Sequence, residues 1–361
     1  MKKTFAATTY KYPKPINFDS DNFEFDIFKK ITDEICPEAK IEMLKNVRIA
    51  NNSVVFKYFK IFRNSCYNQE NYELHSKGYK FFIKYFFPKL NFSKKRFLLL
   101  TDEWTSNYYH WHAFSLKKLL ILQNQKLIDK NSLIFLTTRY QRSKFYLDSL
   151  AKFGISKDQI FFLRRNSNIK VAELPLIEEP RQHPEIYKKI RQTVIDNTKI
   201  LDLKFGDKIY LSREKQILRF VENSDETHAL LEKWGFKKVI AEDFSYDEQV
   251  SIFYNAKYLV APHGAGLTNA MFMKEGGKVL EMAAVIGPAS NRNFNRDFYA
   301  LLTMVGLKYF YQECEIGEKS GKGIKDFHHG SLVVDLEKLE KNLKLMLANE
   351  PNNKSEKPLN H

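Results

Sequence analysis

The fold is decided by the stretch Tyr258-Leu-Val-Ala-Pro-His-Gly-Ala-Gly-Leu-Thr-Asn269. Its apolar beginning is typical of a buried strand, and the glycines at positions 264 and 266 mark a tight turn. A helix is expected over residues 267–273. Glycines allow backbone N–H groups to approach a ligand closely, and the first turn of a helix offers N–H groups that lack helical partners. The stretch therefore predicts a strand, a turn and a helix, which either bind a diphosphate or form a connection without a ligand.

Strands and helices alternate on both sides of this stretch. Short apolar runs predict the strands, and apolar residues at helical spacing predict the helices between them. This alternation is typical of parallel sheets with helices on both faces, so we predict an α/β fold. The predicted strands are 97–100, 132–137, 159–163, 208–211, 238–241, 258–261 and 278–282. The predicted helices are 142–153, 185–197, 225–234, 246–255 and one that contains Leu116, Leu119, Leu120 and Leu127.

The alternation is interrupted at residues 171–181, which contain two prolines and several glutamates. We place a domain boundary there, and about two domains suit a chain of 361 residues. We predict an N-terminal α/β domain over 1–180 and a second α/β domain over 181–325. The first 95 residues form an irregular, β-rich extension with a strand pair around 47–61 that turns at Asn51-Asn52-Ser53. A strand (332–335) and a helix (336–347) are predicted within 326–348, and a disordered tail over 349–361.

The chain is strongly basic. It has 58 Lys and Arg against 43 Asp and Glu, which gives a formal net charge of +15. Such a charge suits nucleic acid, an anionic membrane surface or phosphorylated substrates, but lysines scattered over most helices also make an ordinary basic surface. The three cysteines form no Cys-x-x-Cys pair, which favours a reduced compartment. We find no export signal and no apolar stretch long enough to span a membrane, so we expect a cytoplasmic protein.

Two further strands are expected to carry polar residues near their carboxyl ends. Arg213 follows the strand 208–211 and is suited to binding a phosphate with its forked guanidinium, although a surface loop is an equally good interpretation. Glu281 lies inside the apolar strand 278–282, where a carboxylate is costly unless it is paired. Glu281 would either accept hydrogen bonds from two ribose hydroxyls or pair internally with Arg or Lys.

Aromatic residues and histidines gather after the first strand of the first domain. Residues 107–112, Asn-Tyr-Tyr-His-Trp-His, follow Asp102 and Glu103. Their rings could stack on a sugar and supply a base near pH 7, or the segment could begin a helix that packs into the core. His110 and His112 have no third ligand nearby in the sequence, so a metal site is not expected. The sequence also contains no P-loop and no zinc-binding pattern.

These segments, in this order, resemble glycosyltransferase family 61 over about residues 97–310. The resemblance implies an α/β GT-B architecture, in which two Rossmann-like domains face each other across a cleft. It also implies an inverting transfer from a nucleotide-sugar donor without an obligatory metal or other cofactor. Two motifs depart from the family pattern: Asn-Glu-x-Glu is Asn223-Ser-Asp-Glu here, and an Arg-Arg pair is Arg219-Phe220. The resemblance is carried by Tyr108–Trp111, Tyr210–Arg213, Asn223–Glu226 with Gly235-Phe236, Glu248-Gln249, His263–Asn269 and Lys278–Glu281.

The resemblance also implies roles for individual residues. Arg213 and the N–H groups of the glycine-containing turn would stabilise the leaving diphosphate, and Glu281 would bind the ribose. An inverting transfer needs a base beside the acceptor hydroxyl, which would be His110, with Asp102 and Glu103 as alternatives. The implied donor-binding residues are Arg213, His263, Gly264, Ala265, Gly266, Asn269 and Glu281, and the implied acceptor-binding residues are Tyr109, Trp111 and His112.

The resemblance and the composition together imply a bacterial enzyme of surface-polysaccharide biosynthesis, such as capsule or lipopolysaccharide assembly. Its partners would be a nucleotide-sugar donor and a glycan or lipid-linked glycan acceptor, with peripheral contact with an anionic membrane at its inner face. A nucleic-acid partner is not expected. Two alternatives stay open: a polysaccharide pyruvyltransferase, and a non-catalytic protein that binds glycans or nucleic acid on the same fold.

Overall fold

The chain forms two compact units that interleave along the sequence. A computed structural model describes residues 5–19, 21–77, 79–84, 89–91, 95–178, 182–284, 294–318 and 330–348. Among these residues, unit 1 comprises 5–12, 32–203 and 244–254, and unit 2 comprises 13–31, 204–243 and 255–348. Parallel and antiparallel sheets occur together with helices, so the fold is mixed α/β, as predicted. The predicted disordered tail over 349–361 lies outside the described residues.

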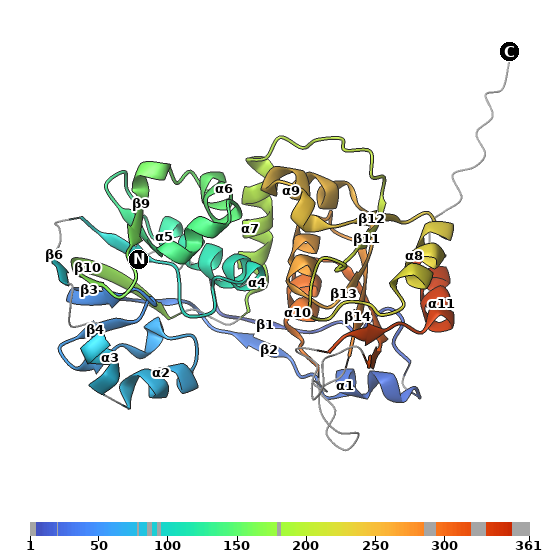
Figure 1. Cartoon of the computed structure of the whole chain (residues 1–361), viewed down its shortest axis with the longest axis horizontal. Helices are drawn as coiled ribbons and strands as arrows, with labels where there is room; N and C mark the ends of the chain where they lie inside the picture. The colour runs from blue at the N-terminus through green and yellow to red at the C-terminus, as the bar shows by residue number, and fades with distance from the viewer. Residues whose placement is uncertain are drawn as a thin grey trace, which may run out of the picture. The chain divides into compact units, whose positions relative to one another are not determined.

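Unit 1 contains a three-stranded parallel sheet with the order β7-β8-β9. Its strands are β7 (Phe97–Leu99), β8 (Leu133–Thr137) and β9 (Ile160–Leu163), each at a predicted position. The helices that belong to this part are α5 (Leu116–Asn124), α6 (Phe145–Lys152) and α7 (Pro184–Asp196), and α7 packs against the other two (Figure 1). The helix α5 ends before Leu127, which the sequence analysis had included in it.

A second sheet of unit 1 corrects the sequence analysis. Its strand order is β5-β4-β3-β10-β6, and β10 (Asn168–Glu178) pairs with β3 (Lys40–Ala50) in antiparallel register from Asn168↔Ala50 to Glu178↔Lys40. The segment 171–181, where the sequence analysis placed a domain boundary and no strand, is therefore a strand up to residue 178. Its apolar side chains are buried and its backbone pairs with β3, which compensates for the proline and the glutamates. The other strands are β4 (Val55–Lys57), β5 (Lys60–Ile61) and β6 (Lys89–Asn91).

The turn between β3 and β4 falls at residues 51–53, which confirms the predicted strand pair. Elsewhere in unit 1 a two-stranded antiparallel sheet joins the N-terminal strand to the segment that follows residue 31. The remaining elements of unit 1 are β1 (Thr8–Tyr10), β2 (Glu34–Cys36), α2 (Gln69–Ser76), α3 (Tyr79–Lys84), α4 (Tyr108–His110) and α9 (Tyr246–Asn255) up to residue 254.

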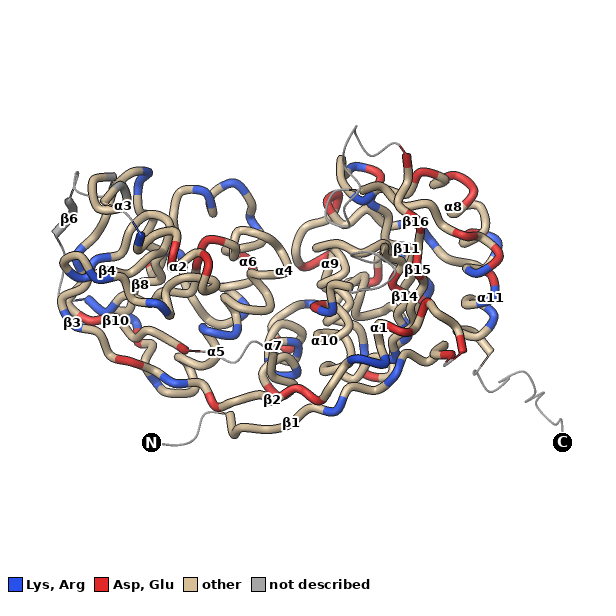
Figure 2. Tube along the Cα trace, turned by 90° about the horizontal axis from the view of Figure 1, so that it is seen from below, with Lys and Arg blue, Asp and Glu red and all other residues tan. Residues whose placement is uncertain are grey.

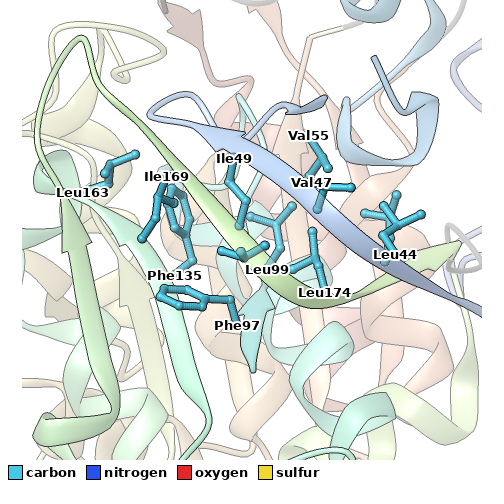
Figure 3. Packing of buried hydrophobic residues seen from close by; sticks show 12 residues of the cluster. Leu44, Val47, Ile49, Val55, Phe97, Leu99, Phe135, Leu163, Ile169 and Leu174 are labelled. Atoms are coloured by element: carbon cyan, nitrogen blue, oxygen red, sulfur yellow. The ribbon is translucent and has the colours of Figure 1, made fainter. Parts of the chain in front are cut away.

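One buried cluster joins the two large sheets of unit 1 (Figure 3). The parallel sheet contributes Phe97, Leu99 and Phe135, and the mixed sheet contributes residues such as Ile49 and Leu174. Side chains from both sheets thus share one interior, which makes burial of apolar area the main force that holds unit 1 together. The complete cluster is Leu44, Val47, Ile49, Val55, Phe97, Leu99, Phe135, Leu163, Ile169, Val171, Leu174 and Leu176.

Unit 2 is built on a five-stranded parallel sheet with the order β12-β11-β13-β14-β15. Helices α8 and α11 cover one face of this sheet, and α10 covers the other (Figure 1). The strands are β12 (Lys237–Val239), β11 (Lys208–Leu211), β13 (Tyr258–Pro262), β14 (Lys278–Ala283) and β15 (Lys308–Glu313). The helices are α1 (Asp26–Lys29), α8 (Ser224–Lys233), α10 (Asp297–Met304) and α11 (Leu336–Leu347), and β16 (Glu315–Ile316) pairs with β17 (Leu332–Val333).

The two units do not coincide with the two predicted segments 1–180 and 181–325. Helix α7 belongs to unit 1 because it packs against α5 and α6. Residues 13–31 belong to unit 2, where the Ile16 N–H donates to the Tyr309 carbonyl at 2.8 Å and Phe28 is buried against aromatic rings of β15 and α10. The domain boundaries at residues 180 and 325 stay predictions.

Charge is spread over the whole described chain. Basic and acidic positions are interspersed along the traces of both units (Figure 2). This distribution matches the scattered lysines of the sequence, so the net charge by itself marks no single site. Among the described residues, every helix is too short or too polar to cross a lipid bilayer.

The shared interior of unit 1 yields a stability prediction. Replacing fully buried Leu174 by Ala should lower the free energy of unfolding by about 2–5 kcal/mol, because it removes apolar contacts and leaves a cavity. Met43→Ala on the neighbouring strand is a matched control, since Met43 is 42% exposed. Urea unfolding followed by tryptophan fluorescence measures both. Equal, small effects of the two substitutions would contradict the assignment of β10 to the core.

Candidate functional site

In the unit 2 sheet the strand order reverses between β11 and β13. From β11 it moves first to β12 on one side and then to β13 on the other. In open parallel sheets ligands bind outside the carboxyl ends of the strands at such a switch point. The residues that follow these two strands are Ser212 and Arg213 after β11, and His263 and Gly264 after β13. The stretch that decides the fold therefore also lies at the position where a ligand is expected.

Arg213 packs directly against Gly264. A Cβ atom at residue 264 would lie 2.6 Å from the Cζ atom of the Arg213 guanidinium, and closer still to its Nη1. The backbone at Gly264 is extended, so the glycine serves this close approach and not a left-handed conformation. Arg213 also donates through Nη2 to the Leu218 carbonyl at 3.1 Å, which holds the guanidinium in place. The structure thus brings together Arg213 and the glycine turn, which the sequence analysis had assigned to one site.

A second arginine, Arg219, accompanies Arg213. Burial, together with the positive charge of Arg219, lowers the pKa of Arg213 to about 10. Burial also lowers the pKa of Arg219, and the negative charge of Glu281 acts in the opposite direction. In the part of the chain that the structure describes, the Nε atoms of both arginines are buried without a hydrogen-bond partner. Two half-buried cations whose Nε atoms make no hydrogen bond are costly, and an anion bound by both would remove most of that cost.

Glu281 is fully buried and makes two side-chain hydrogen bonds. Its Oε1 pairs with Nδ1 of His263, and its Oε2 accepts from the Tyr309 hydroxyl at 2.7 Å. The structure therefore shows the internal pairing that the sequence analysis had weighed against ribose binding, with a histidine in place of Arg or Lys. The ribose role itself stays a prediction. The contact orients the His263 ring, which packs edge-on against Phe298.

The turn after β13 continues as a 3₁₀ helix, Ala265–Phe272, where the sequence analysis expected a helix over 267–273. Its ends close with bonds between residues three apart: the Leu267 N–H donates to the Gly264 carbonyl, and the Met273 N–H to the Ala270 carbonyl. Ala265 and Gly266 are half-buried, whereas Asn269 is buried. The residues predicted to bind the diphosphate thus gather at this end of the sheet, while their roles stay predictions.

The aromatic and histidine segment of unit 1 forms α4 followed by a π-helical turn, Trp111–Ser115. Trp111 is fully buried and donates through Nε1 to Ser149 Oγ at 2.8 Å. His112 is also fully buried: its Nδ1–H donates to the Tyr108 carbonyl at 2.8 Å, so its Nε2 accepts from the Tyr246 hydroxyl at 3.1 Å. Tyr109 is buried as well. As the chain is folded here, these three side chains lie in the interior, and their predicted acceptor contacts stay predictions.

The three candidate bases have different surroundings. Asp102 accepts through Oδ1 from the backbone N–H groups of Trp104 and Thr105, at 2.9 and 3.1 Å. Glu103 is held on both oxygens: Oε1 by His75 at 3.0 Å, and Oε2 by the Tyr67 N–H at 2.9 Å. Burial opposes ionisation of Glu103, but these hydrogen bonds outweigh it and lower its pKa.

His110 packs behind an aromatic wall. Its ring stacks on Phe114 with centroids 5.4 Å apart and meets Tyr67 edge-on at 5.3 Å. Tyr67 and Phe114 also line a cavity of about 670 Å³ in unit 1, here called the unit 1 cavity. Its other lining residues include Arg63, Asp102, Lys118 and Glu178. Among the three candidate bases, Asp102 is the one that lines it.

Several residues at the switch point of the unit 2 sheet and in the unit 1 cavity were not predicted from the sequence. Arg219 lies in a loop, and its one signal was its position in the altered Arg-Arg pair. Tyr67 and Lys118 carried no signal, because each lies many positions from Asp102 in the chain and reaches the unit 1 cavity through tertiary packing.

Residues 108–280 match the family model described as Glycosyltransferase 61. No curated protein matches the chain. The matched segment runs from α4 into β14 and contains Arg213, Arg219 and the turn after β13. It supports glycosyltransferase family 61, and with it a glycosyltransferase activity, for this part of the chain.

The enclosed His112 yields a prediction about pH. Burial lowers its pKa from 6.5 to about 4, against the hydrogen bond to Tyr108. Because the unfolded chain then binds the proton more tightly, stability should fall as the pH drops from about 6.5 to 4, by up to about 3 kcal/mol. His112→Gln cannot take up this proton and should have a flatter profile over that range. Urea unfolding at several pH values measures both proteins, and parallel profiles would show that His112 is not buried in its neutral form.

Proposed function

We propose that this protein is an inverting glycosyltransferase that moves a sugar from a nucleotide-sugar donor to a glycan acceptor. The observation that carries the proposal is the pair of half-buried arginines, Arg213 and Arg219, at the switch point of the unit 2 sheet. The close approach of Arg213 to Gly264 and the match to the family model described as Glycosyltransferase 61 support it.

The arginine pair suits the diphosphate of the donor. Guanidinium groups bind phosphate oxygens with two parallel hydrogen bonds, and both arginines retain an unused Nε–H. Negative charge grows on the diphosphate as it leaves, so cations already in place stabilise the transition state more than the ground state. In this proposal the arginines take the part that a divalent metal plays elsewhere, and neither a metal nor another cofactor is obligatory. In this proposal His263 and Asn269 lie beside the bound diphosphate, and Glu281 positions His263.

The acceptor side is assigned to unit 1, with Asp102 as the general base. A base must reach the acceptor hydroxyl, and Asp102 is the candidate that lines the unit 1 cavity. As the acceptor oxygen bonds to the anomeric carbon, Asp102 takes the hydroxyl proton. The bond from that carbon to the diphosphate oxygen breaks, and the electron pair leaves with the diphosphate. His110 and Glu103 are the alternatives to Asp102.

The wider setting follows from the resemblance and the composition. We propose that the two units are the two domains of the GT-B architecture, and that the protein acts in bacterial surface-polysaccharide biosynthesis, such as capsule or lipopolysaccharide assembly. The acceptor would be a glycan that is lipid-linked at the inner face of the plasma membrane. The excess of positive charge supports peripheral contact of the protein with anionic lipid. A nucleic-acid partner is not part of this proposal.

The donor site is tested by nucleotide binding. Arg213→Ala and Arg219→Ala should each weaken binding of the preferred nucleotide by about 10- to 100-fold, because each removes a charge-assisted contact with the diphosphate. Gly264→Ala should act in the same direction, because its Cβ displaces the Arg213 guanidinium. Isothermal titration calorimetry with UDP, GDP and CMP, at constant salt, measures the affinities.

A matched control for these variants is Lys215→Ala. Lys215 lies in the same loop but is exposed and paired with Asp243. Its replacement should change nucleotide affinity by less than about twofold. Absence of binding by all three nucleotides, or an equal loss in Lys215→Ala and Arg213→Ala, would refute the donor site.

The base is tested by turnover. Asp102→Asn keeps an oxygen for the N–H groups of Trp104 and Thr105 but cannot accept a proton, so turnover should fall by about 10²- to 10⁴-fold with nucleotide affinity unchanged. Release of the nucleoside diphosphate from the preferred nucleotide sugar measures this. Glu103→Gln and His110→Ala are run beside it. If one of those two loses turnover while Asp102→Asn retains it, the base is that residue and not Asp102.

A further inference from the structure

The unit 1 cavity has the size and the surroundings of a ligand site. Its volume of about 670 Å³ lies within the range of small-molecule pockets. Asp102 and Lys118 reach it although their residues are only 4% and 8% exposed, so their charged groups are largely shielded from bulk water. Charged groups held in a shielded cavity interact with a ligand more strongly than the same groups do on an open surface.

We infer that the unit 1 cavity binds one neutral sugar ring, which is the end of the acceptor glycan. The inference rests on the proposed function in one respect, which is that the bound sugar belongs to the acceptor. The cavity itself belongs to unit 1 alone and involves no residue of the donor site. The inference names the class of the acceptor, an uncharged sugar, and two residues that recognise it, Tyr67 and Lys118.

The charges of the cavity favour an uncharged ligand. Among the described residues that line the cavity, two cationic side chains, Arg63 and Lys118, are balanced by two carboxylates, Asp102 and Glu178. Because the two signs balance, these four side chains give neither an anionic nor a cationic ligand a net electrostatic attraction. A sugar hydroxyl both donates and accepts hydrogen bonds, and a ring with several hydroxyls can use both kinds of group at once.

The distance between Asp102 and Lys118 supports the same conclusion. Lys118 Nζ lies 3.5 Å from Asp102 Oδ2, which is longer than a close charge-assisted hydrogen bond of about 2.7–2.9 Å. Because Oδ1 is already used by two backbone N–H groups, Oδ2 is the oxygen that can accept from a ligand. Lys118 also forms an ion pair with Asp102, and a hydroxyl beside this pair would donate to Asp102 Oδ2 and accept from Lys118 Nζ.

An aromatic wall supplies the apolar side of the site. The rings of Tyr67 and Phe114 both line the cavity and pack edge-to-face with centroids 6.0 Å apart. The Tyr67 ring also contacts Trp104 and His110, and the Tyr67 N–H donates to the Glu103 carboxylate. These contacts position the ring before a ligand arrives, which reduces the ordering cost of binding. The C–H face of a sugar ring can pack on such rings while its hydroxyls reach the polar side.

The inference is tested by sugar binding in the absence of nucleotide. Saturation-transfer difference NMR is recorded on the full-length protein with the methyl glycosides of glucose, galactose, mannose and N-acetylglucosamine, and with those of glucuronic acid and glucosamine as charged counterparts. At least one neutral glycoside should give a signal at millimolar concentration, and the charged counterparts should give a weaker one.

Two variants and two matched controls locate the signal. Tyr67→Ala, which removes the stacking ring, and Lys118→Met, which keeps the side-chain length but removes the cation, should each lower the signal by at least about fivefold. Tyr58→Ala and Lys157→Met should keep it, because Tyr58 is 82% exposed and Lys157 lies on the surface of unit 1. Circular dichroism checks the fold of each variant. If Tyr67→Ala does not fold, the result with Lys118→Met alone shows whether the sugar binds in the unit 1 cavity.

The outcomes separate this inference from the proposed function. The inference is overturned if no neutral glycoside gives a signal, if a charged glycoside gives the stronger one, or if Lys118→Met leaves the signal unchanged. Nucleotide binding measured on the same samples reports on the donor site independently. Nucleotide binding without sugar binding would remove the inference alone, whereas sugar binding without nucleotide binding would leave a sugar site on a protein that is not a glycosyltransferase.

Discussion

The carboxylate of Glu281, buried inside a parallel sheet, is the constraint on which the unit 2 site depends. A charge in such a place costs several kcal/mol unless neighbouring groups compensate for it. The strand on one side supplies His263 and the strand on the other side supplies the Tyr309 hydroxyl, so one carboxylate links β13, β14 and β15. The same contact orients the His263 ring beside Gly264, the residue whose missing Cβ leaves room for Arg213.

The two arginines at this edge of the sheet form the anion site of our proposal. Burial lowers the pKa of both arginines, and the positive charge of Arg219 lowers the pKa of Arg213 further. In our proposal an anionic ligand offsets the cost of this pair, so the proposal rests on local geometry and not on the net charge of +15. The remaining basic positions alternate with acidic ones along both units (Figure 2), as on an ordinary solvated surface.

Local patterns predicted much of the fold. The strand 208–211 and the helices 246–255 and 336–347 have the predicted bounds, because apolar periodicity depends on residues close together in the chain. The strand β10 was not predicted, because Pro175 and the glutamates are typical of loops. Its pairing with β3, more than 100 residues earlier, overrides that local preference: Arg48 of β3 donates to the side chain of Asn168, 120 positions away.

The sequence by itself determined the α/β alternation, the glycine turn after β13 and the presence of Arg213 at the end of a neighbouring strand. These features follow from the spacing of apolar residues and from the special freedom of glycine, which are properties of short segments. Only the tertiary structure decided that Glu281 pairs with His263 and Tyr309, that Arg219 joins Arg213, and that Asp102 shares a cavity with Tyr67 and Lys118. Burial and electrostatic neighbours arise from contacts between distant parts of the chain, and no local pattern encodes them.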